Sequence, residues 1–466
     1  MTLTDAQSIL LANKQEHILR FWDKLSDKEQ NQLLEQIEAL DFNAVSKMQT
    51  IFANRNKKSD ASTIEMRPAP VTIFEGEATN AATRIGEQEI KDGHVAVIVV
   101  AGGQGTRLGF NGPKGCFPIC PISNESLFYF HSRKILALEK LFDAVIPFYI
   151  MTSQSNNAQT VECFEQNNYF GLKKENVFFF MQSMWPALDS NGKIIMESPS
   201  RIFMSPDGHG GTLSALKNSG GLADMRKRGI QTVFYFQVDN PMVEIADPTF
   251  IGFHKQNVAD ISVKVCAKRD PEEGLGVVVE RNGKTEIVEY TEFTPEQKNE
   301  RLENGELKYK FGSVAIHIFS LHFLEQEADA GLPLHIAYKK VPYCDETGKI
   351  VNPSAPNAYK FEKFIFDALS DAKVVCCLAF DRDQEFSPIK NPQGNDSPEM
   401  CRNDLMKKWM EWFDKCGIII PRDDSGNPKI RIEIDPVFAN SSEILKTQLL
   451  LSNHPTIDLK KDIWLH

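Results

Sequence analysis

The stretch Val95–Cys120, VAVIVVAGGQGTRLGFNGPKGCFPIC, decides how the rest of the chain is interpreted. Its first part, Val95–Ala101, is apolar, uncharged and rich in β-branched residues, which predicts a strand buried on both faces. The strand ends in a glycine-rich loop that also contains Arg107 and Lys114. Glycines let backbone N–H groups approach an anion closely, and cations neutralise it. The stretch therefore predicts a phosphate-binding loop for a nucleoside triphosphate.

The composition is that of an ordinary globular chain with an acidic balance. The sequence has 466 residues, of which 42% are hydrophobic and 25% charged, and its formal net charge is −11. This length allows two or three domains, and the acidic balance argues against a nucleic-acid partner. No apolar run approaches the ~20 residues that span a bilayer, and the N-terminus lacks a signal-peptide pattern. We expect a cytoplasmic monomer without a membrane partner, whose nine cysteines are free thiols.

Apolar runs alternate with amphipathic helices from Val95 to about Phe380. The expected strands are Val95–Ala101, Ile146–Thr152, Val177–Gln182, Thr232–Val238, Ile261–Ala267 and Val374–Phe380. This repetition predicts an α/β fold with a Rossmann-like, mostly parallel sheet and helices on both faces. Ligands of such sheets bind beyond the carboxyl ends of the strands, where several of the motifs below begin.

Other patterns flank this region and divide the chain. Residues 1–92 predict a helical arm followed by a polar connector with one or two short helices. Residues 93–385 form the expected main domain, in which GVVVERNGKTEIVEY predicts a hairpin around Asn282-Gly283. Residues 386–466 predict a small C-terminal domain with one helix and short strands.

The glycine loop departs from two common nucleotide-binding motifs. A Walker A loop requires G-K-[ST], but Lys114 is followed by Gly115. A dinucleotide-binding loop requires G-x-G-x-x-G, whereas the glycine that follows Gly103-Gln104-Gly105 comes one residue late, at Gly109. An NAD-dependent oxidoreductase is therefore a weak alternative.

Three further sites carry polar residues where expected strands end or helices begin. Gln182 ends a strand, and its amide could read a base edge through both donor and acceptor. Gly208 and His209 lie in SPDGHGG before a helix, where backbone N–H groups can bind ligand oxygens. Asp239 and Asn240 follow the apolar run TVFYFQ, where a carboxylate is well placed to hold Mg²⁺ against phosphates.

Two charged residues outside these strand ends are also candidates. Glu289 follows the predicted hairpin and could accept hydrogen bonds from sugar hydroxyls. Lys390 lies in EFSPIKN, where the rigid Ser-Pro step favours a positioned ammonium.

The motif AGGQGTRLG followed by PKG resembles the signature of nucleotidyltransferases that make nucleotide-sugars. From about Val95 to Asn391 the motifs occur in an order similar to that of the eukaryotic-type UDP-N-acetylhexosamine pyrophosphorylases of the UDPGP type 1 family. The resemblance implies a GT-A-like nucleotide-diphospho-sugar transferase fold, with residues 93–385 as the nucleotidyltransferase domain. It also implies that UTP and a sugar-1-phosphate react to give a UDP-sugar and pyrophosphate, with Mg²⁺ as the cofactor. The expected sugar phosphate is N-acetylglucosamine-1-phosphate.

The resemblance also assigns roles to residues of this chain. Nucleotide binding falls to Gly102, Gly103, Gly105, Thr106, Leu108, Gly109, Gln182 and Gly208. Arg107 and Lys114 would bind the triphosphate and offset charge on the leaving pyrophosphate, and Lys390 would grip the phosphate of the sugar. Asp239 would bind Mg²⁺. The sugar would lie near His209, Asn240, Gly276 and Glu289.

Departures from the family pattern concern the sugar. The family reads PDGNGG where this chain has His209 in the Asn position, and GNIANHFF where it has GSVAIHIF. Ser313 and Ile316 thus replace two asparagines expected near the sugar, while His317 is kept. A glucose- or galactose-1-phosphate substrate, or a broad pocket, is the alternative. A non-catalytic nucleotide-binding protein on the same fold is a more distant alternative. The charged candidates Arg107, Lys114, Asp239 and Lys390 are all intact, which argues against it.

Overall fold

The computed structural model describes residues 1–55, 66–73, 75–451 and 457–466, and in them the chain forms two compact units. The larger unit contains residues 65–181, 215–330 and 368–466. The smaller unit contains the described part of residues 1–64 together with residues 182–214 and 331–367. Part of the predicted connector, residues 56–65 and 74, lies outside the described residues. The boundaries expected after residues 92 and 385 stay predictions.

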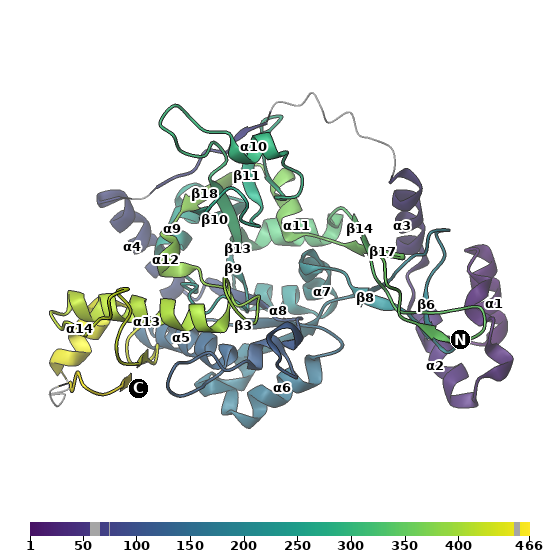
Figure 1. The fold of residues 1–466 in the computed structure, drawn as a ribbon, viewed down its shortest axis with the longest axis horizontal. Coiled ribbons are helices and arrows are strands. Elements are labelled where there is room, and N and C mark those ends of the chain that lie inside the picture. The colour runs from purple at the N-terminus through teal and green to yellow at the C-terminus, as the bar shows by residue number, and fades with distance from the viewer. Residues whose placement is uncertain (56–65, 74, 452–456) are drawn as a thin grey trace. The chain divides into compact units, whose positions relative to one another are not determined.

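A ten-stranded sheet is the centre of the larger unit (Figure 1). Its main path consists of β1 (Met66–Pro68), β11 (Val277–Arg281), β13 (Phe311–Ser320), β9 (Thr232–Gln237), β2 (Val95–Val100), β3 (Phe148–Thr152) and β4 (Val177–Met181). Off this path lie β10 (Ile261–Ala267), β12 (Lys284–Val288) and β18 (Val375–Ala379). The pairs β2–β3, β2–β9, β3–β4 and β10–β18 are parallel. All six strands expected from the sequence are confirmed.

Strand β13 was not among the expected strands, and it runs antiparallel to β9, β10 and β11. Its register against β10 shifts between Val263 and Val265, and Ala315 has a φ of 58°. Such a bulge bends a strand. The first half of β13 pairs with β11 at Gly312, and the second half pairs with β9. The strand thus connects the parallel strands to the predicted hairpin β11–β12, which the structure confirms.

Helices cover both faces of the sheet, as alternating side chains require. Phe148 on β3 packs near Phe164 of α6 (Asn157–Gln166), whose ring centre lies 5.1 Å from that of Phe128 on α5 (Leu127–Phe142). The next residue, Tyr149, points to the other face. Its hydroxyl donates to Asp224 of α8 (Gly221–Lys227) at 2.7 Å. The other α-helices of this unit include α4 (Glu77–Lys91), α9 (Pro248–Gln256), α10 (Pro295–Asn299), α11 (Leu321–Ala330) and α12 (Arg382–Glu385).

The C-terminal segment adds to the core of the larger unit. It contains α13 (Pro398–Lys415), β19 (Ile432–Ile434), α14 (Ser442–Leu451) and β20 (Ile463–Leu465). The expected helix and short strands are present, and α14 is an additional helix. Leu405, Trp409 and Leu445 are buried in the same hydrophobic cluster as the strands of the sheet.

The smaller unit contains the predicted helical arm. Its helices are α1 (Leu3–Ala12), α2 (Asp27–Ala39) and α3 (Phe42–Asn54). Leu10, Leu33 and Met48 from these helices share a buried cluster with Leu188 and Phe361. The later segments form two-stranded sheets, β5 (Met184–Pro186) with β8 (Met204–Pro206), β6 (Met196–Ser198) with β7 (Arg201–Ile202), β14 (His335–Lys339) with β17 (Ala358–Glu362) and β15 (Tyr343–Cys344) with β16 (Ile350–Val351). Helix α7 (Thr212–Asn218) begins in this unit.

Candidate active site

The glycine loop after β2 folds back on itself as a tight hairpin. The N–H of Lys114 donates to the Gly103 carbonyl at 3.0 Å, and the N–H of Gly105 donates to Gly112 at 2.9 Å. The buried side chain of Asn156 donates to the carbonyls of Ala101 (2.9 Å) and Gly103 (3.2 Å). These bonds hold the loop in one conformation directly at the end of the strand.

The loop keeps donors available for an anion. The backbone N–H groups of Gly102 and Gly103 have no hydrogen-bond partner within the described part of the chain. Thr106–Leu108 forms one 3₁₀ turn, which ends at Gly109 with a φ of 72°. The side chain of Arg107 is exposed, and no described residue pairs with it. A free guanidinium beside exposed backbone donors suits a phosphate.

Lys114 and Asp239, which are 125 residues apart, form an ion pair. The ammonium lies 2.9 Å from Oδ2 of Asp239, and the two side chains are only 19% and 12% exposed. The contact arises because β2 and β9 are adjacent and parallel, so that the segments after both strands lie at one edge of the sheet. Two residues predicted for phosphate and metal are therefore brought together.

The donor set around Asp239 fits a magnesium ion carried in with phosphates. Among residues 1–55, 66–73, 75–451 and 457–466, no group of three or more His, Cys, Asp or Glu side chains could hold a metal alone. Mg²⁺ commonly uses one or two carboxylates and completes its shell with phosphate oxygens and water. A single carboxylate at a strand end is consistent with that mode. The assignment of Mg²⁺ to Asp239 stays a prediction.

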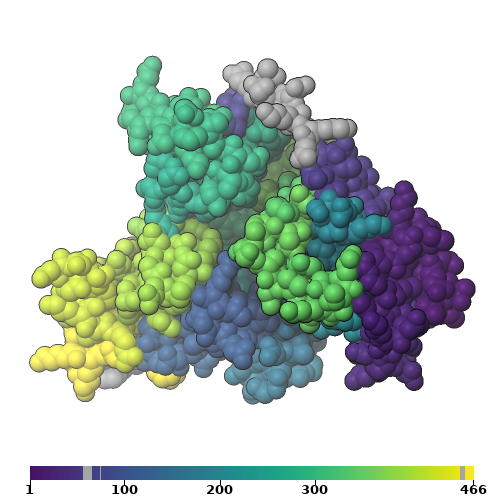
Figure 2. Space-filling view, turned by 45° about the vertical axis from the view of Figure 1, so that its right-hand side comes forward, coloured from purple at the N-terminus to yellow at the C-terminus, as the bar shows by residue number. Residues whose placement is uncertain are grey.

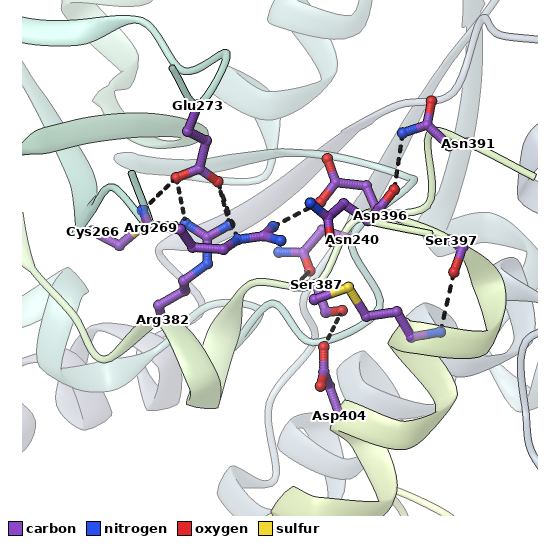
Figure 3. Close-up of polar contacts among 12 residues, drawn as sticks. Asn240, Cys266, Arg269, Glu273, Arg382, Ser387, Asn391, Asp396, Ser397 and Asp404 are labelled. Carbon is purple, nitrogen blue, oxygen red and sulfur yellow. Dashed lines mark hydrogen bonds and ion pairs between the residues drawn. The ribbon is translucent and has the colours of Figure 1, made fainter. Parts of the chain in front are cut away.

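Asn240 holds the segment that leads to Lys390. Its side-chain N–H donates to the carbonyl of Glu385 at 2.7 Å. Its Oδ1 accepts the N–H of Ser387 at 3.1 Å, and Figure 3 shows both of these residues. The N–H of Ile389 donates to the carbonyl of Asp239 at 2.9 Å. Asn240 is 4% exposed, and these contacts give it a structural task. Its predicted role at the sugar stays a prediction.

Lys390 is a half-buried cation without a salt bridge. Its ammonium lies 5.9 Å from the ring centre of Phe386, and no described carboxylate pairs with it. Because Ile389 is hydrogen-bonded to Asp239, the residue next to Lys390 lies against the segment that carries the Lys114–Asp239 pair. An ammonium of this kind can bind a second phosphate.

Gly276, Glu289 and Ser313 lie together at the hairpin. The N–H of Ser313 donates to the Gly276 carbonyl at 2.8 Å, and a Cβ at Gly276 would lie 3.8 Å from Oε1 of Glu289. Ile316 is 1% exposed and belongs to the core. His317 is also buried, with its ring 5.7 Å from that of Tyr235. Ser313 and Ile316 depart from the family pattern in this stretch. Of these two, only Ser313 lies beside an amino acid predicted to contact the sugar, Gly276.

The second glycine loop belongs to the smaller unit and has a different character. Gly208 has a φ of 85°, and a Cβ there would lie 2.5 Å from the carbonyl oxygen of Lys363. The ring of His209 stacks on Phe364 at 5.4 Å, and its Nδ1 accepts the N–H of Ile365. Burial lowers the pKa of His209 to about 4, so that this side chain is neutral near pH 7.

Gln182 follows β4 and is 9% exposed. It belongs to the smaller unit with Gly208 and His209, whereas the other predicted site residues belong to the larger unit. The sequence reasoning missed Asn156, which anchors the glycine loop. The signal was present, since Asn156 comes shortly after β3, where the carboxyl end of a strand reaches the same edge of the sheet.

The sequence matches the family described as UTP–glucose-1-phosphate uridylyltransferase over residues 42–444. The UDP-N-acetylglucosamine pyrophosphorylase of Saccharomyces cerevisiae is 36% identical over 447 residues, which cover 90% of this chain and 92% of that protein. The UDP-N-acetylhexosamine pyrophosphorylase-like protein 1 of Homo sapiens is 35% identical over 478 residues, with 96% and 94% covered.

Solved structures agree with these sequence matches. The uridine diphosphate N-acetylglucosamine pyrophosphorylase of Trypanosoma brucei, in complex with an inhibitor, superposes with a TM-score of 0.83 at 29% identity and covers 100% of this chain and 99% of its own. A UDP-glucose pyrophosphorylase mutant from Leishmania major has a TM-score of 0.61 at 16% identity, with 90% and 86% covered. This second likeness concerns the fold alone.

Proposed function

The chain belongs to the UTP–glucose-1-phosphate uridylyltransferase family, and on this premise we propose that it joins UTP and a sugar-1-phosphate into a UDP-sugar and pyrophosphate. We propose N-acetylglucosamine-1-phosphate as the preferred sugar phosphate, in line with the names of the relatives. The observation that carries the proposal is the Lys114–Asp239 pair, which lies at the strand ends beside the glycine loop.

The reaction needs positioning and charge neutralisation more than proton transfer. An oxygen of the sugar phosphate attacks the α-phosphorus of UTP, a new P–O bond forms, and the bond from the α-phosphorus to the bridging oxygen breaks. Pyrophosphate leaves with the electron pair of that bond. The attacking phosphate is already ionised, so no general base is required. The main cost is the approach of two anions, which fixed cations offset.

The cations of the larger unit divide this work. Arg107 and Lys114 would bind the triphosphate and offset the charge that develops on pyrophosphate. Lys390 would hold the phosphate of the sugar. The absence of a carboxylate partner for Arg107 and Lys390 among the described residues supports these roles, because neither cation has to leave an ion pair to bind substrate. When bound, Mg²⁺ would be held by Asp239 and would neutralise phosphate charge.

The remaining predicted residues would bind the nucleotide and the sugar. The backbone from Gly102 to Gly109, together with Gln182 and Gly208, would hold the nucleotide. His209, Asn240, Gly276 and Glu289 would lie near the sugar. No described helix is both long and apolar enough to cross a membrane, and we propose a cytoplasmic monomer.

Product formation across a panel of sugar phosphates tests this function. The purified chain is incubated with UTP, Mg²⁺ and the 1-phosphates of N-acetylglucosamine, N-acetylgalactosamine, glucose or galactose, and UDP-sugars are separated by chromatography. We expect the highest kcat/KM with N-acetylglucosamine-1-phosphate, and a kcat/KM about 10²-fold lower for Asp239→Asn. The absence of UDP-sugar with every acceptor would overturn the proposal.

A hexose-1-phosphate is the second candidate, and Ser313 is the observation that favours it. The backbone N–H of this residue donates to the Gly276 carbonyl, and its hydroxyl stands where the family pattern has an amide, so that one amide for an N-acetyl sugar is lost. Ser313→Asn restores the amide, and Ser313→Ala is the matched control. If the native chain favours glucose-1-phosphate and only the Asn variant shifts toward N-acetylglucosamine-1-phosphate, the second candidate holds. An unchanged preference in both variants would exclude Ser313 as the determinant.

A further inference from the structure

A chain of ion pairs that ends at Asp396 connects two loops of the larger unit (Figure 3). Arg382 donates to Glu273 at 2.6 and 3.2 Å. Arg269 also pairs with Glu273, with 3.3 Å between its Nε and a carboxylate oxygen. The other end of the Arg269 guanidinium donates to Asp396 at 2.7 Å. Figure 2 shows the segment after β18 in yellow-green close to the teal segment that carries the hairpin.

Asp396 closes the loop that begins at Lys390. Its carbonyl accepts the backbone N–H of Lys390 at 2.7 Å and that of Asn391 at 3.1 Å. Asp396 has a φ of 56°, a conformation that side-chain-bearing residues adopt at a cost. The neighbouring side chain of Asn391 donates to the carbonyl of Asn395 at 2.9 Å. The position of the Lys390 backbone therefore depends on where Asp396 is held.

The opposite side of the same segment is fixed by the strand-end residues. Ile389 donates to the carbonyl of Asp239, and Ser387 donates through its N–H to Asn240 and through its hydroxyl to Asp404 at 2.6 Å. Lys390 is thus attached on one side to the Asp239 segment and on the other to Asp396. Each attachment is anchored by a side-chain ion pair, since Asp239 pairs with Lys114 of the glycine loop and Asp396 pairs with Arg269.

We propose that Arg269 and Asp396 are positioning residues that hold Lys390 where it binds the sugar phosphate. The proposal rests on the proposed function of Lys390. Neither residue needs to touch the substrate, because Asp396 acts through its carbonyl on the Lys390 N–H. The ion pair is partly buried, with the side chains of Arg269 and Asp396 only 27% and 24% exposed, so that water screens it less than a fully exposed pair.

An arginine suits position 269 because two carboxylates must be bound at once. The guanidinium presents a planar fork whose separate edges reach Glu273 and Asp396, and the backbone N–H of Arg269 adds a second contact with Glu273 at 2.7 Å. A lysine ammonium is a single point charge and cannot span both partners in this geometry. Glu273 lies three residues before Gly276, so the same ion pairs connect the Lys390 loop to the start of the predicted sugar site.

Steady-state kinetics with each substrate varied separately test the proposal. We expect Arg269→Ala and Asp396→Asn each to raise KM for the sugar phosphate about 10-fold, with KM for UTP unchanged. Arg269→Lys should be intermediate. Arg226→Ala is the matched control, because Arg226 makes a bidentate pair with Glu325 away from these loops. Arg226→Ala should leave both KM values unchanged. Equal losses for both substrates, or no change, would overturn the proposal.

A second background separates this inference from the function it rests on. In Lys390→Ala, the Arg269→Ala change should add less than about two-fold, because the group that it positions is gone. An undiminished effect of Arg269→Ala in that background would contradict the positioning role. If Lys390→Ala is impaired while Arg269→Ala and Asp396→Asn are normal, only this inference fails. If Lys390→Ala itself is normal, the proposed role of Lys390 fails and the inference fails with it.

Discussion

The two glycine loops of this chain look alike in sequence but differ in chemistry. The loop after β2 carries the free cation Arg107 and the ion-paired Lys114, together with exposed backbone donors. The loop around Gly208 carries a neutral His209 and a buried Asp207, whose pKa burial raises to about 7. The first loop is suited to anions, whereas the second combines a neutral imidazole with a carboxyl that is partly ionised near pH 7. Glycine content alone therefore does not identify a phosphate site. The charges beside the loop and their burial determine whether it can bind an anion.

The largest effect should follow from loss of charge in the first loop. We expect Arg107→Ala to lower kcat by about 10²–10³-fold, similar to the loss of one transition-state donor in other enzymes. Because Arg107 is exposed and unpaired in the described chain, the melting temperature should stay unchanged. The exposed Arg84 on α4 provides Arg84→Ala as a control. A near-native kcat for Arg107→Ala would remove the distinction between the loops.

A smaller and non-additive loss should follow from breaking the Lys114–Asp239 pair. We expect Lys114→Met and Asp239→Asn each to lower kcat/KM by about 10²-fold, and the double variant to lose much less than their product, since the groups act as a unit. Kinetics of the four proteins in a double-mutant cycle measure this coupling. Full additivity would mean that the two side chains act independently.

The backbone of the two loops should respond oppositely to an added methyl group. Gly208→Ala should destabilise the protein by about 3 kcal/mol, because a left-handed φ is strained for alanine and its Cβ would meet the Lys363 carbonyl. Gly103→Ala has open space and no positive φ, so its folding stability should be near native while its KM for UTP rises. Denaturant unfolding and UTP kinetics check both expectations. Similar stability losses in the two variants would contradict the comparison.

The smallest effect concerns pH and the second loop. The side-chain oxygens of Asp207 have no hydrogen-bond partner in the described residues, and burial raises the pKa of this carboxyl from 3.8 to about 7. Because the pKa of this carboxyl is higher in the folded than in the unfolded chain, it contributes stability that is fully present below about pH 4. That contribution is lost as the pH rises through about 7.

Asp207→Asn removes this loss because an amide does not titrate. The free energy of unfolding of the variant minus that of the native chain should increase by about 2 kcal/mol from pH 5 to pH 8. Denaturant unfolding at both pH values measures this difference. Asp189→Asn, at a turn of the same unit, is the control. A stability difference that does not depend on pH would contradict the shifted pKa.

Local patterns predicted much of the fold and less of the site. The six expected strands were visible as apolar runs, and four of them, β2, β3, β9 and β10, are buried on both faces. Strand β13 was missed because GSVAIHIF mixes small and polar residues and contains the bulge at Ala315. The grouping of residues 182–214 and 331–367 with the N-terminal helices depends on contacts between distant segments, which periodicity does not report.

In the site, too, contacts at neighbouring strands could be predicted and contacts between distant loops could not. The approach of Lys114 to Asp239 could be expected, because both follow neighbouring parallel strands. The ion pair from Arg269 to Asp396 joins two irregular loops 127 residues apart, and spacing in the sequence gives no hint of it. The hydrogen bonds by which Asn240 holds the backbone of Glu385 and Ser387 were likewise not visible in the sequence, and its place near the sugar stays a prediction.

The most direct test of uridylyl transfer follows the phosphorus atoms of UTP. The chain is incubated with Mg²⁺, N-acetylglucosamine-1-phosphate and UTP labelled with ³²P at either the α- or the γ-position, and the products are separated. Attack on the α-phosphorus predicts that the α-label appears in the UDP-sugar and the γ-label in pyrophosphate. Release of the γ-label as inorganic phosphate, or retention of both labels in UTP, would contradict the proposed reaction.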